Sequence, residues 1–182
     1  ERIASNFGPE NIAACIVEPI AGSTGTLVPP KGYLQRLREI CDKHGILLIF
    51  DEVITGWGRT GSSFASHEFG VTPDLMTMAK ATTNGVVPMG VVACKDEIYD
   101  AVMDASPMGS VELFHGYTYS GIPVAVAAGL AVQDIFEKED IFNRAKNLAP
   151  YFQKGLFSLQ DLDSVENIRG YGMMGGIDMK MN

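Results

Sequence analysis

The chain has 182 residues, 46% of them hydrophobic and 20% charged, which is enough to bury a sizeable core in one domain or a little more. Its net charge of −8, with lysines and arginines scattered along the chain, argues against a nucleic-acid partner. No apolar run approaches the ~20 residues needed to cross a bilayer, so we expect no membrane partner. The cysteines Cys15, Cys41 and Cys94 show neither a disulfide framework nor metal-binding spacing, which favours a reducing cytoplasm and no metal.

The ends of the sequence are unusual for a whole protein. It begins without methionine, with a polar stretch that is unlike a leader peptide, and it stops at Met181-Asn182 just as an apolar segment ends. We therefore expect a fragment of a longer protein.

The first part of the chain predicts a βαβ unit. Residues 12–17 and 46–50 are continuous apolar runs, which are typical of parallel strands buried on both faces. Between them, residues 33–44 carry apolar side chains at helical spacing and are followed by a glycine suited to a helix end. Functional groups in such a unit gather at the carboxyl ends of the strands, where Glu18 and Asp51 lie.

The middle of the chain predicts two more strands and a helix. Residues 71–74 lead into a short strand that delivers Lys80, and residues 89–94 have the apolar character of another strand. Residues 123–136 are rich in alanine and apolar almost all round, which predicts a buried helix with proline in its first turn.

The last part of the chain has a different composition. An amphipathic helix is expected at roughly 141–159, and the glycines within residues 165–179 favour a strand pair, or a strand and a bend. The shift in composition near residues 137–140 predicts a domain boundary that divides the chain into residues 1–139 and 140–182.

Asp51 and Lys80 have the most informative chemistry. Lys80 is the lone lysine of an otherwise uncharged stretch, and a lysine amine in apolar surroundings loses its proton readily and can form a Schiff base with an aldehyde. Asp51 ends an apolar strand, where a carboxylate can hold a heterocyclic cation. The pair predicts a pyridoxal phosphate site, provided that both side chains face one cleft. Taken alone, each residue has a plainer interpretation, a solvated loop lysine and a turn-capping aspartate.

Seven motifs follow one another along the chain: Val17-Glu18-Pro19-Ile20, Asp51 to Gly61, Pro73-Asp74, Ala79-Lys80, Thr83-Asn84-Gly85, Pro88-Met89-Gly90 and Phe114 to Ser120. In this order they resemble the class III (omega) aminotransferases among the fold-type-I pyridoxal-phosphate enzymes. The omega-amino acid:pyruvate (β-alanine:pyruvate) group is the nearest. The resemblance implies an α/β fold, in which residues 1–139 form part of a large cofactor-binding domain with a mostly parallel sheet. Residues 140–182 would begin a small C-terminal α+β domain.

The resemblance also implies roles for individual residues. Lys80 would bind the cofactor aldehyde and then move a proton as general base and acid, and Asp51 would pair with the pyridine nitrogen. Val53 would press on one face of the ring. Thr118 would bind the cofactor phosphate from the neighbouring subunit, with Tyr117 beside it in the cofactor site, which implies a homodimer with shared active sites. Without the resemblance, Thr118 is as well explained as a cap of the following helix.

The implied reaction of the complete enzyme is transfer of an amino group from an omega-amino acid or amine donor to pyruvate or a similar keto acid acceptor. Ser23 and Ile54 replace a glutamate and a glutamine of other class III members, and both departures point to the pyruvate-using group. Ile122 replaces a histidine expected in that group. The family's phosphate loop and its carboxylate-binding arginine have no counterpart in this sequence, so we expect the chain alone to be inactive. Another class III chemistry, decarboxylating or mutase, stays open, as does a truncated or non-catalytic domain unable to hold cofactor.

Two other motif residues are expected to have structural roles. Glu18 is expected to form a strand-end hydrogen bond or an ion pair, for which Arg59 is a possible partner. Trp57 is expected in the core rather than at the cofactor.

Overall fold

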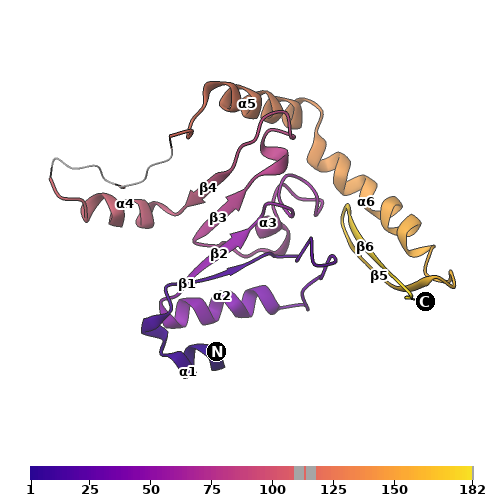
Figure 1. Ribbon diagram of the computed structural model, residues 1–182, viewed down its shortest axis with the longest axis horizontal. Coiled ribbons are helices and arrows are strands. Elements are labelled where there is room, and N and C mark those ends of the chain that lie inside the picture. The colour runs from indigo at the N-terminus through magenta and orange to yellow at the C-terminus, as the bar shows by residue number, and fades with distance from the viewer. Residues whose placement is uncertain (109–112, 114–117, 182) are drawn as a thin grey trace.

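The computed structural model describes residues 1–108, 113 and 118–181, and the predicted Tyr117 lies outside them. Figure 1 shows the order of the elements along the chain and their arrangement in space. The helices and strands are α1 (Arg2–Phe7), the 3-10 turn η1 (Pro9–Asn11), β1 (Ala14–Val17), α2 (Tyr33–His44), β2 (Leu47–Asp51), α3 (Ala65–Phe69), β3 (Leu75–Met78), the 3-10 turn η2 (Lys80–Thr82), β4 (Val91–Cys94), α4 (Asp96–Asp104), α5 (Pro123–Lys138), α6 (Ile141–Phe157), β5 (Val165–Tyr171) and β6 (Met174–Met179).

A four-stranded sheet in the order β1-β2-β3-β4 forms the centre of the chain. β1, β2 and β3 are parallel, and β4 runs antiparallel to β3, which confirms the mostly parallel sheet. α2 connects β1 to β2, as a crossover between parallel strands requires. The predicted βαβ unit is therefore present. Register pairs Asp51 with Thr77, and Thr77 with Val92.

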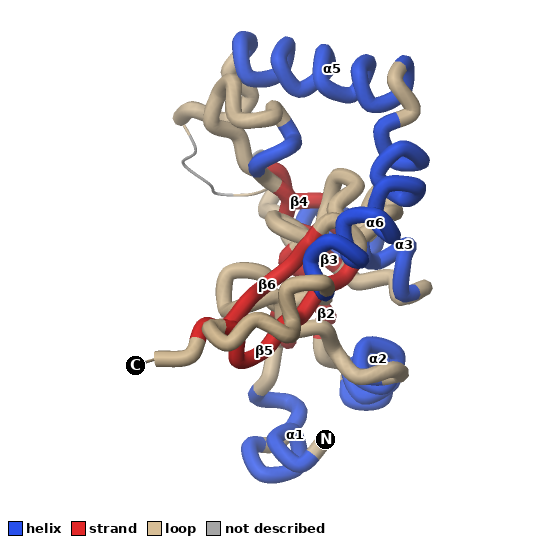
Figure 2. Tube along the Cα trace, turned by 90° about the vertical axis from the view of Figure 1, so that its right-hand side faces the viewer, coloured by secondary structure: helices blue, strands red, loops and turns tan. Residues whose placement is uncertain are grey.

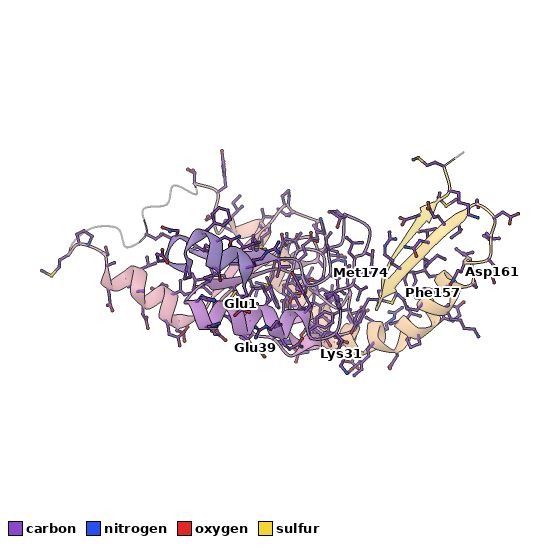
Figure 3. The ribbon with its side chains drawn as sticks, turned by 90° about the horizontal axis from the view of Figure 1, so that it is seen from below. Glu1, Lys31, Glu39, Phe157, Asp161 and Met174 are labelled. Atoms are coloured by element: carbon purple, nitrogen blue, oxygen red, sulfur yellow. The ribbon has the colours of Figure 1, made fainter. Side chains whose placement is uncertain are left out.

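Only one face of this sheet is covered by the described residues. Leu48 and Phe50 are fully buried and pack with Leu34 and Cys41 of α2 and with α1. Figure 3, seen from below, shows α2 along this side, with Glu1 close to it, where Glu1 pairs with lysine and arginine side chains of the helix.

The opposite face of the sheet is open. Ile16 of β1 is 62% exposed and Val92 of β4 is 66% exposed. The prediction that both apolar runs form strands buried on two faces is therefore wrong for this chain. The physical reason is that α2 can cover only one side, and α5 lies beyond the end of the sheet rather than across its open face (Figure 1).

α5 is also less buried than its composition predicted. Ala125, Gly129 and Val132, which share one stripe of the helix, are buried, whereas Val124 and Leu130 are exposed. The stripe packs on the η2 turn, where a Cβ added at Gly129 would lie 3.6 Å from the carbonyl oxygen of Thr82. The prediction of a helix buried all round is wrong, because no described element packs against its other apolar side.

The C-terminal part consists of α6 and a β5–β6 hairpin, which confirms the predicted strand pair. The hairpin turns at Gly172, whose φ of 58° is readily adopted by glycine. Gln153 of α6 donates hydrogen bonds to the carbonyl oxygens of Gly172 and Met174, at 2.8 and 2.9 Å. Helix and hairpin therefore form one packed unit, which Figure 2 shows with the strands in front of the central sheet.

The hairpin also contacts the first half of the chain. The Met173 N–H donates to the carbonyl oxygen of Arg59 at 2.8 Å, and Arg169 Nε donates to that of Gly25 at 2.7 Å. α5 and α6 meet at Asp140, which has a left-handed backbone with φ 48°. The proposed division into residues 1–139 and 140–182 stays a prediction. None of the described helices has the length and apolar character needed to cross a bilayer.

Candidate active site

Asp51 is the last residue of β2 and lies on the open face of the sheet. Leu48 and Phe50 point to the α2 side, so strand alternation directs Asp51 to the opposite side. Its Oδ1 accepts a hydrogen bond from the Val53 N–H at 3.0 Å. No described residue donates to its Oδ2. The half-buried carboxylate is thus held through one oxygen, and its other oxygen has no donor among the described residues.

Lys80 begins the η2 turn directly after β3. Its φ of 50° is in the left-handed region, which costs a lysine about 1–2 kcal/mol, and residues strained in this way cluster at functional sites. Its side chain is exposed, and its amine makes no hydrogen bond or ion pair with a described residue. The expectation that Lys80 lies in apolar surroundings is therefore wrong for this chain, because α5 packs on the Thr82 side of the turn and leaves the Lys80 side chain exposed.

The register of the sheet brings Asp51 and Lys80 to the same edge. Neighbouring strands lie about 4.8 Å apart and three residues span at most about 10 Å, so the Cα atoms of Asp51 and Lys80 are within about 15 Å. A cavity of about 1020 Å³ opens at this edge, with Val53 and Ala79 in its wall. Asp51 and Lys80 do not line it themselves but adjoin residues that do. A shared cleft stays a prediction. The wall is formed by Val53, Thr77, Met78, Ala79, Pro88 to Val92, Thr118 to Ile122, Ala125 and Val126.

Val53 and Thr118, both assigned to the cofactor from the sequence, line this one cavity from separate segments. Val53 follows β2, and Thr118 lies in the exposed segment that leads to α5. The N-cap residue of α5 is Ile122, so Thr118 is not the cap of that helix. The two residues therefore share a wall with the β3–β4 edge.

Glu52 is a buried carboxylate beside the site that the sequence interpretation missed. It is fully buried and accepts hydrogen bonds from the Thr55 hydroxyl at 2.7 Å and from the N–H groups of Ala65 and Ser66 at 2.8 and 2.7 Å. Its own N–H donates to the carbonyl oxygen of Thr77 at 2.9 Å. Glu52 thereby ties the loop after Asp51 to α3 and β3. The alternation of β2 was the available signal, since an even-numbered residue there faces the core.

Glu18 accepts a hydrogen bond from the Gly22 N–H at 2.9 Å, which confirms the expected strand-end hydrogen bond. Arg59 is not its partner. Arg59 instead donates to the carbonyl oxygens of Ile54 and Gly56 at 3.0 and 3.3 Å, and burial lowers its pKa. The arginine therefore closes the glycine-containing loop on itself.

Asp74 lies at the start of β3, at the opposite end of that strand from Lys80. Its carboxylate accepts hydrogen bonds from the Leu48 N–H, from Arg38 and from Lys95, each at 2.7 Å. Burial acts to raise the pKa of Asp74, but these donors outweigh burial and hold the pKa below its usual value. The ionised carboxylate thus links α2, β2 and the end of β4.

The class III aminotransferase family model matches residues 2–182. The chain belongs to the class III aminotransferases. It is 56% identical over 180 residues to an omega-aminotransferase of Caulobacter vibrioides, covering 99% of this chain and 41% of that protein. It is 58% identical over 170 residues to a beta-alanine–pyruvate aminotransferase of Pseudomonas aeruginosa, covering 93% of this chain and 38% of that protein. An amine transaminase structure from an uncultivated Pseudomonas species, in a PLP-bound form, superposes with a TM-score of 0.91 at 41% identity, covering 100% of this chain and 41% of that one.

This class III chain spans about two fifths of the length of the relatives it matches. Class III aminotransferases depend on pyridoxal 5′-phosphate. The described residues fit that cofactor: Lys80 offers an unpaired amine, Asp51 offers an uncommitted carboxylate oxygen, and the adjoining cavity is large. No group of three or more potential metal ligands occurs among the residues that the structure describes.

Proposed function

We propose that the complete protein transfers an amino group from an omega-amino acid or amine to pyruvate or a similar keto acid, with pyridoxal 5′-phosphate as cofactor. The observation that carries the proposal is the position of Asp51 one strand away from the turn that bears Lys80. It is supported by the 58% identity to a beta-alanine–pyruvate aminotransferase. Because the chain covers only part of its relatives, the activity is assigned to the complete protein.

The bound cofactor would supply a protonated ring that accepts the electrons left when a substrate carbon loses its proton. The negative charge of Asp51 would keep the proton on the ring nitrogen. The Lys80 amine would anchor the cofactor and, once displaced by the donor amine, take a proton from the substrate carbon and return it to the cofactor. Val53 would give one face of the ring an apolar contact, and the Thr118 hydroxyl would donate to the phosphate.

The assembly is part of the same proposal. In a homodimer, Thr118 would act in the site of the neighbouring subunit, whereas in the single chain it lines the same cavity as Val53. The exposed apolar side of α5, which includes Val124 and Leu130, supports an interface beside this segment. Light scattering on the complete protein tests the dimer, and a monomer that is fully active would refute shared sites.

A cytoplasmic location is supported by free thiols at all three cysteines.

The activity is tested by incubating the complete protein with cofactor, β-alanine and pyruvate and measuring the alanine formed. We expect alanine from the wild type and none from Lys80→Ala, while Lys31→Ala, which changes an exposed lysine that does not line the cavity, keeps the wild-type rate. Borohydride reduction followed by peptide mapping should find the cofactor on Lys80. A label on another lysine would overturn the site.

Product analysis separates the proposal from its alternatives. Release of carbon dioxide, or an isomer of the donor formed without consumption of pyruvate, would identify a decarboxylating or mutase enzyme instead. Failure of the complete protein to retain cofactor would identify a non-catalytic relative.

A further inference from the structure

A chain of hydrogen bonds joins the loop after β2 to the turn that carries Lys80. The indole Nε1 of Trp57 donates to Thr82 Oγ1 at 3.1 Å, and that hydroxyl donates to the carbonyl oxygen of Ala79 at 3.0 Å. The Thr82 N–H donates to the same carbonyl at 3.1 Å. Ala79 immediately precedes Lys80, and Thr82 is buried. The residues on both sides of Lys80 are therefore held by one hydroxyl.

The donor at the start of this chain is itself fixed. Trp57 has a left-handed backbone, with φ 60°, and its backbone N–H donates to the carbonyl oxygen of Ser63 at 2.6 Å. Its ring packs against Phe64 at 4.9 Å and against Phe136 of α5 at 5.7 Å between centroids. The two ring contacts and the backbone restrain the indole in the orientation in which its Nε1–H donates to Thr82 Oγ1.

Lys80 is the residue that needs such a restraint. Its left-handed backbone is unfavourable for lysine, and its amine has no partner among the described residues that could hold it. If the φ of Lys80 relaxed to an ordinary negative value, the Lys80 side chain would point in a different direction relative to Ala79. We propose that Trp57 and Thr82 are positioning residues that hold the Lys80 turn and so aim its amine, an inference that rests on the proposed function of Lys80.

Three substitutions in the complete protein separate the hydrogen bonds from the packing. Thr82→Val removes the hydroxyl but keeps the side-chain shape, Thr82→Ser keeps the hydroxyl, and Trp57→Phe removes the indole N–H but keeps a ring. The matched control is Phe142→Leu, which changes an aromatic contact with Phe136 but removes neither a ring that packs on Trp57 nor a hydrogen-bond donor or acceptor. Loss of one restraint should lower kcat for the amine donor about tenfold, which equals about 1.4 kcal/mol, with KM within about twofold.

The pattern across variants tests the connection. Thr82→Ser should restore kcat to near the wild-type value, and the Trp57→Phe/Thr82→Val double variant should be no slower than Thr82→Val alone, because both changes break the same chain. If the fold-loss in kcat of the double variant equalled the product of the two single losses, the residues would act separately and the proposal would be overturned. A Thr82→Ser variant as slow as Thr82→Val would also overturn it.

A second readout needs no turnover. In the cofactor-free complete protein, the rate at which a small amine-reactive reagent modifies Lys80 can be followed against pH by mass spectrometry, with exposed Lys31 as internal reference. Thr82→Val and Trp57→Phe should change the Lys80 to Lys31 rate ratio by at least about twofold, while Phe142→Leu and Thr82→Ser leave it unchanged. Wild-type ratios in Thr82→Val and Trp57→Phe would refute positioning even if their melting temperatures fell. If borohydride labels a different lysine, the proposed function fails. The rate ratio still decides whether Trp57 and Thr82 position Lys80.

Discussion

Asp74→Asn should destabilise the complete protein by about 2–3 kcal/mol. The substitution keeps an acceptor for the Leu48 N–H but removes the charge that binds Arg38 and Lys95 at 2.7 Å. Hydrogen bonds to charged groups contribute about 1.5–3 kcal/mol and neutral ones about 0.5–1.5 kcal/mol, so the bonds from Leu48 and Arg38, which can stay on the amide oxygen, each lose about 1 kcal/mol. The amide nitrogen cannot accept from Lys95, whose lost pairing adds up to about 1 kcal/mol. The total falls below the 3–5 kcal/mol typical of broken buried pairs, since the Lys95 side chain is 41% exposed and water can replace its partner.

Urea denaturation at pH 7 measures this difference, and Asp42→Asn is the matched control. Asp42 binds the same arginine at 2.7 Å, but its side chain is 65% exposed compared with 9% for Asp74, so its loss should cost less than about 1 kcal/mol. The pKa of Asp74 is lowered in the folded state, so its contribution is present above pH 3.8 and disappears as the pH falls through the folded pKa. Equal costs for the two variants, or an Asp74→Asn cost that does not decrease at all as the pH is lowered below 3.8, would refute the reasoning.

Two further substitutions test the loop after β2 and the C-terminal hairpin. Glu52→Gln should cost about 1–3 kcal/mol in urea denaturation, because its amide nitrogen leaves at least one buried N–H of α3 without an acceptor; unchanged stability would show that these bonds contribute nothing. Burial, and then the neighbouring carboxylate of Glu68, raises the pKa of Tyr171 from 10 to about 12. The folded state therefore favours the neutral phenol, so the stabilisation is full below pH 10 and is lost between pH 10 and 12, by less than about 3 kcal/mol since solvent screens the pair. Tyr171→Phe should remove that pH dependence, and a variant with the wild-type profile would contradict it.

Local signals in the sequence identified the elements well. The helix expected at residues 33–44 is α2, because its apolar spacing and the following glycine depend only on neighbouring residues. Which side of each strand or helix is buried by its neighbours was not predictable in the same way. Apolar runs at 12–17 and 123–136 indicate surfaces that can be buried, but which surface is buried depends on what packs against it, and the described residues cover only one side of each.

The same distinction applies to the site. Asp51 was identifiable because it is the first charged residue after an apolar strand, and its place at the strand's end is confirmed. Its role and that of Lys80 stay predictions. Thr82 and Trp57 have no local signal, since their bond joins residues 25 positions apart in the chain. Only the folded arrangement of β2 and β3 brings them together.

The left-handed backbone of Lys80 implies a trade-off between stability and the proposed activity. Asparagine tolerates the left-handed conformation better than lysine does, so Lys80→Asn should raise the free energy of unfolding by up to about 1 kcal/mol while abolishing the proposed transamination. Directed evolution of the complete protein for heat resistance alone would therefore favour the loss of Lys80, the residue proposed to react. Thermostabilising screens at this position therefore need a simultaneous selection for turnover.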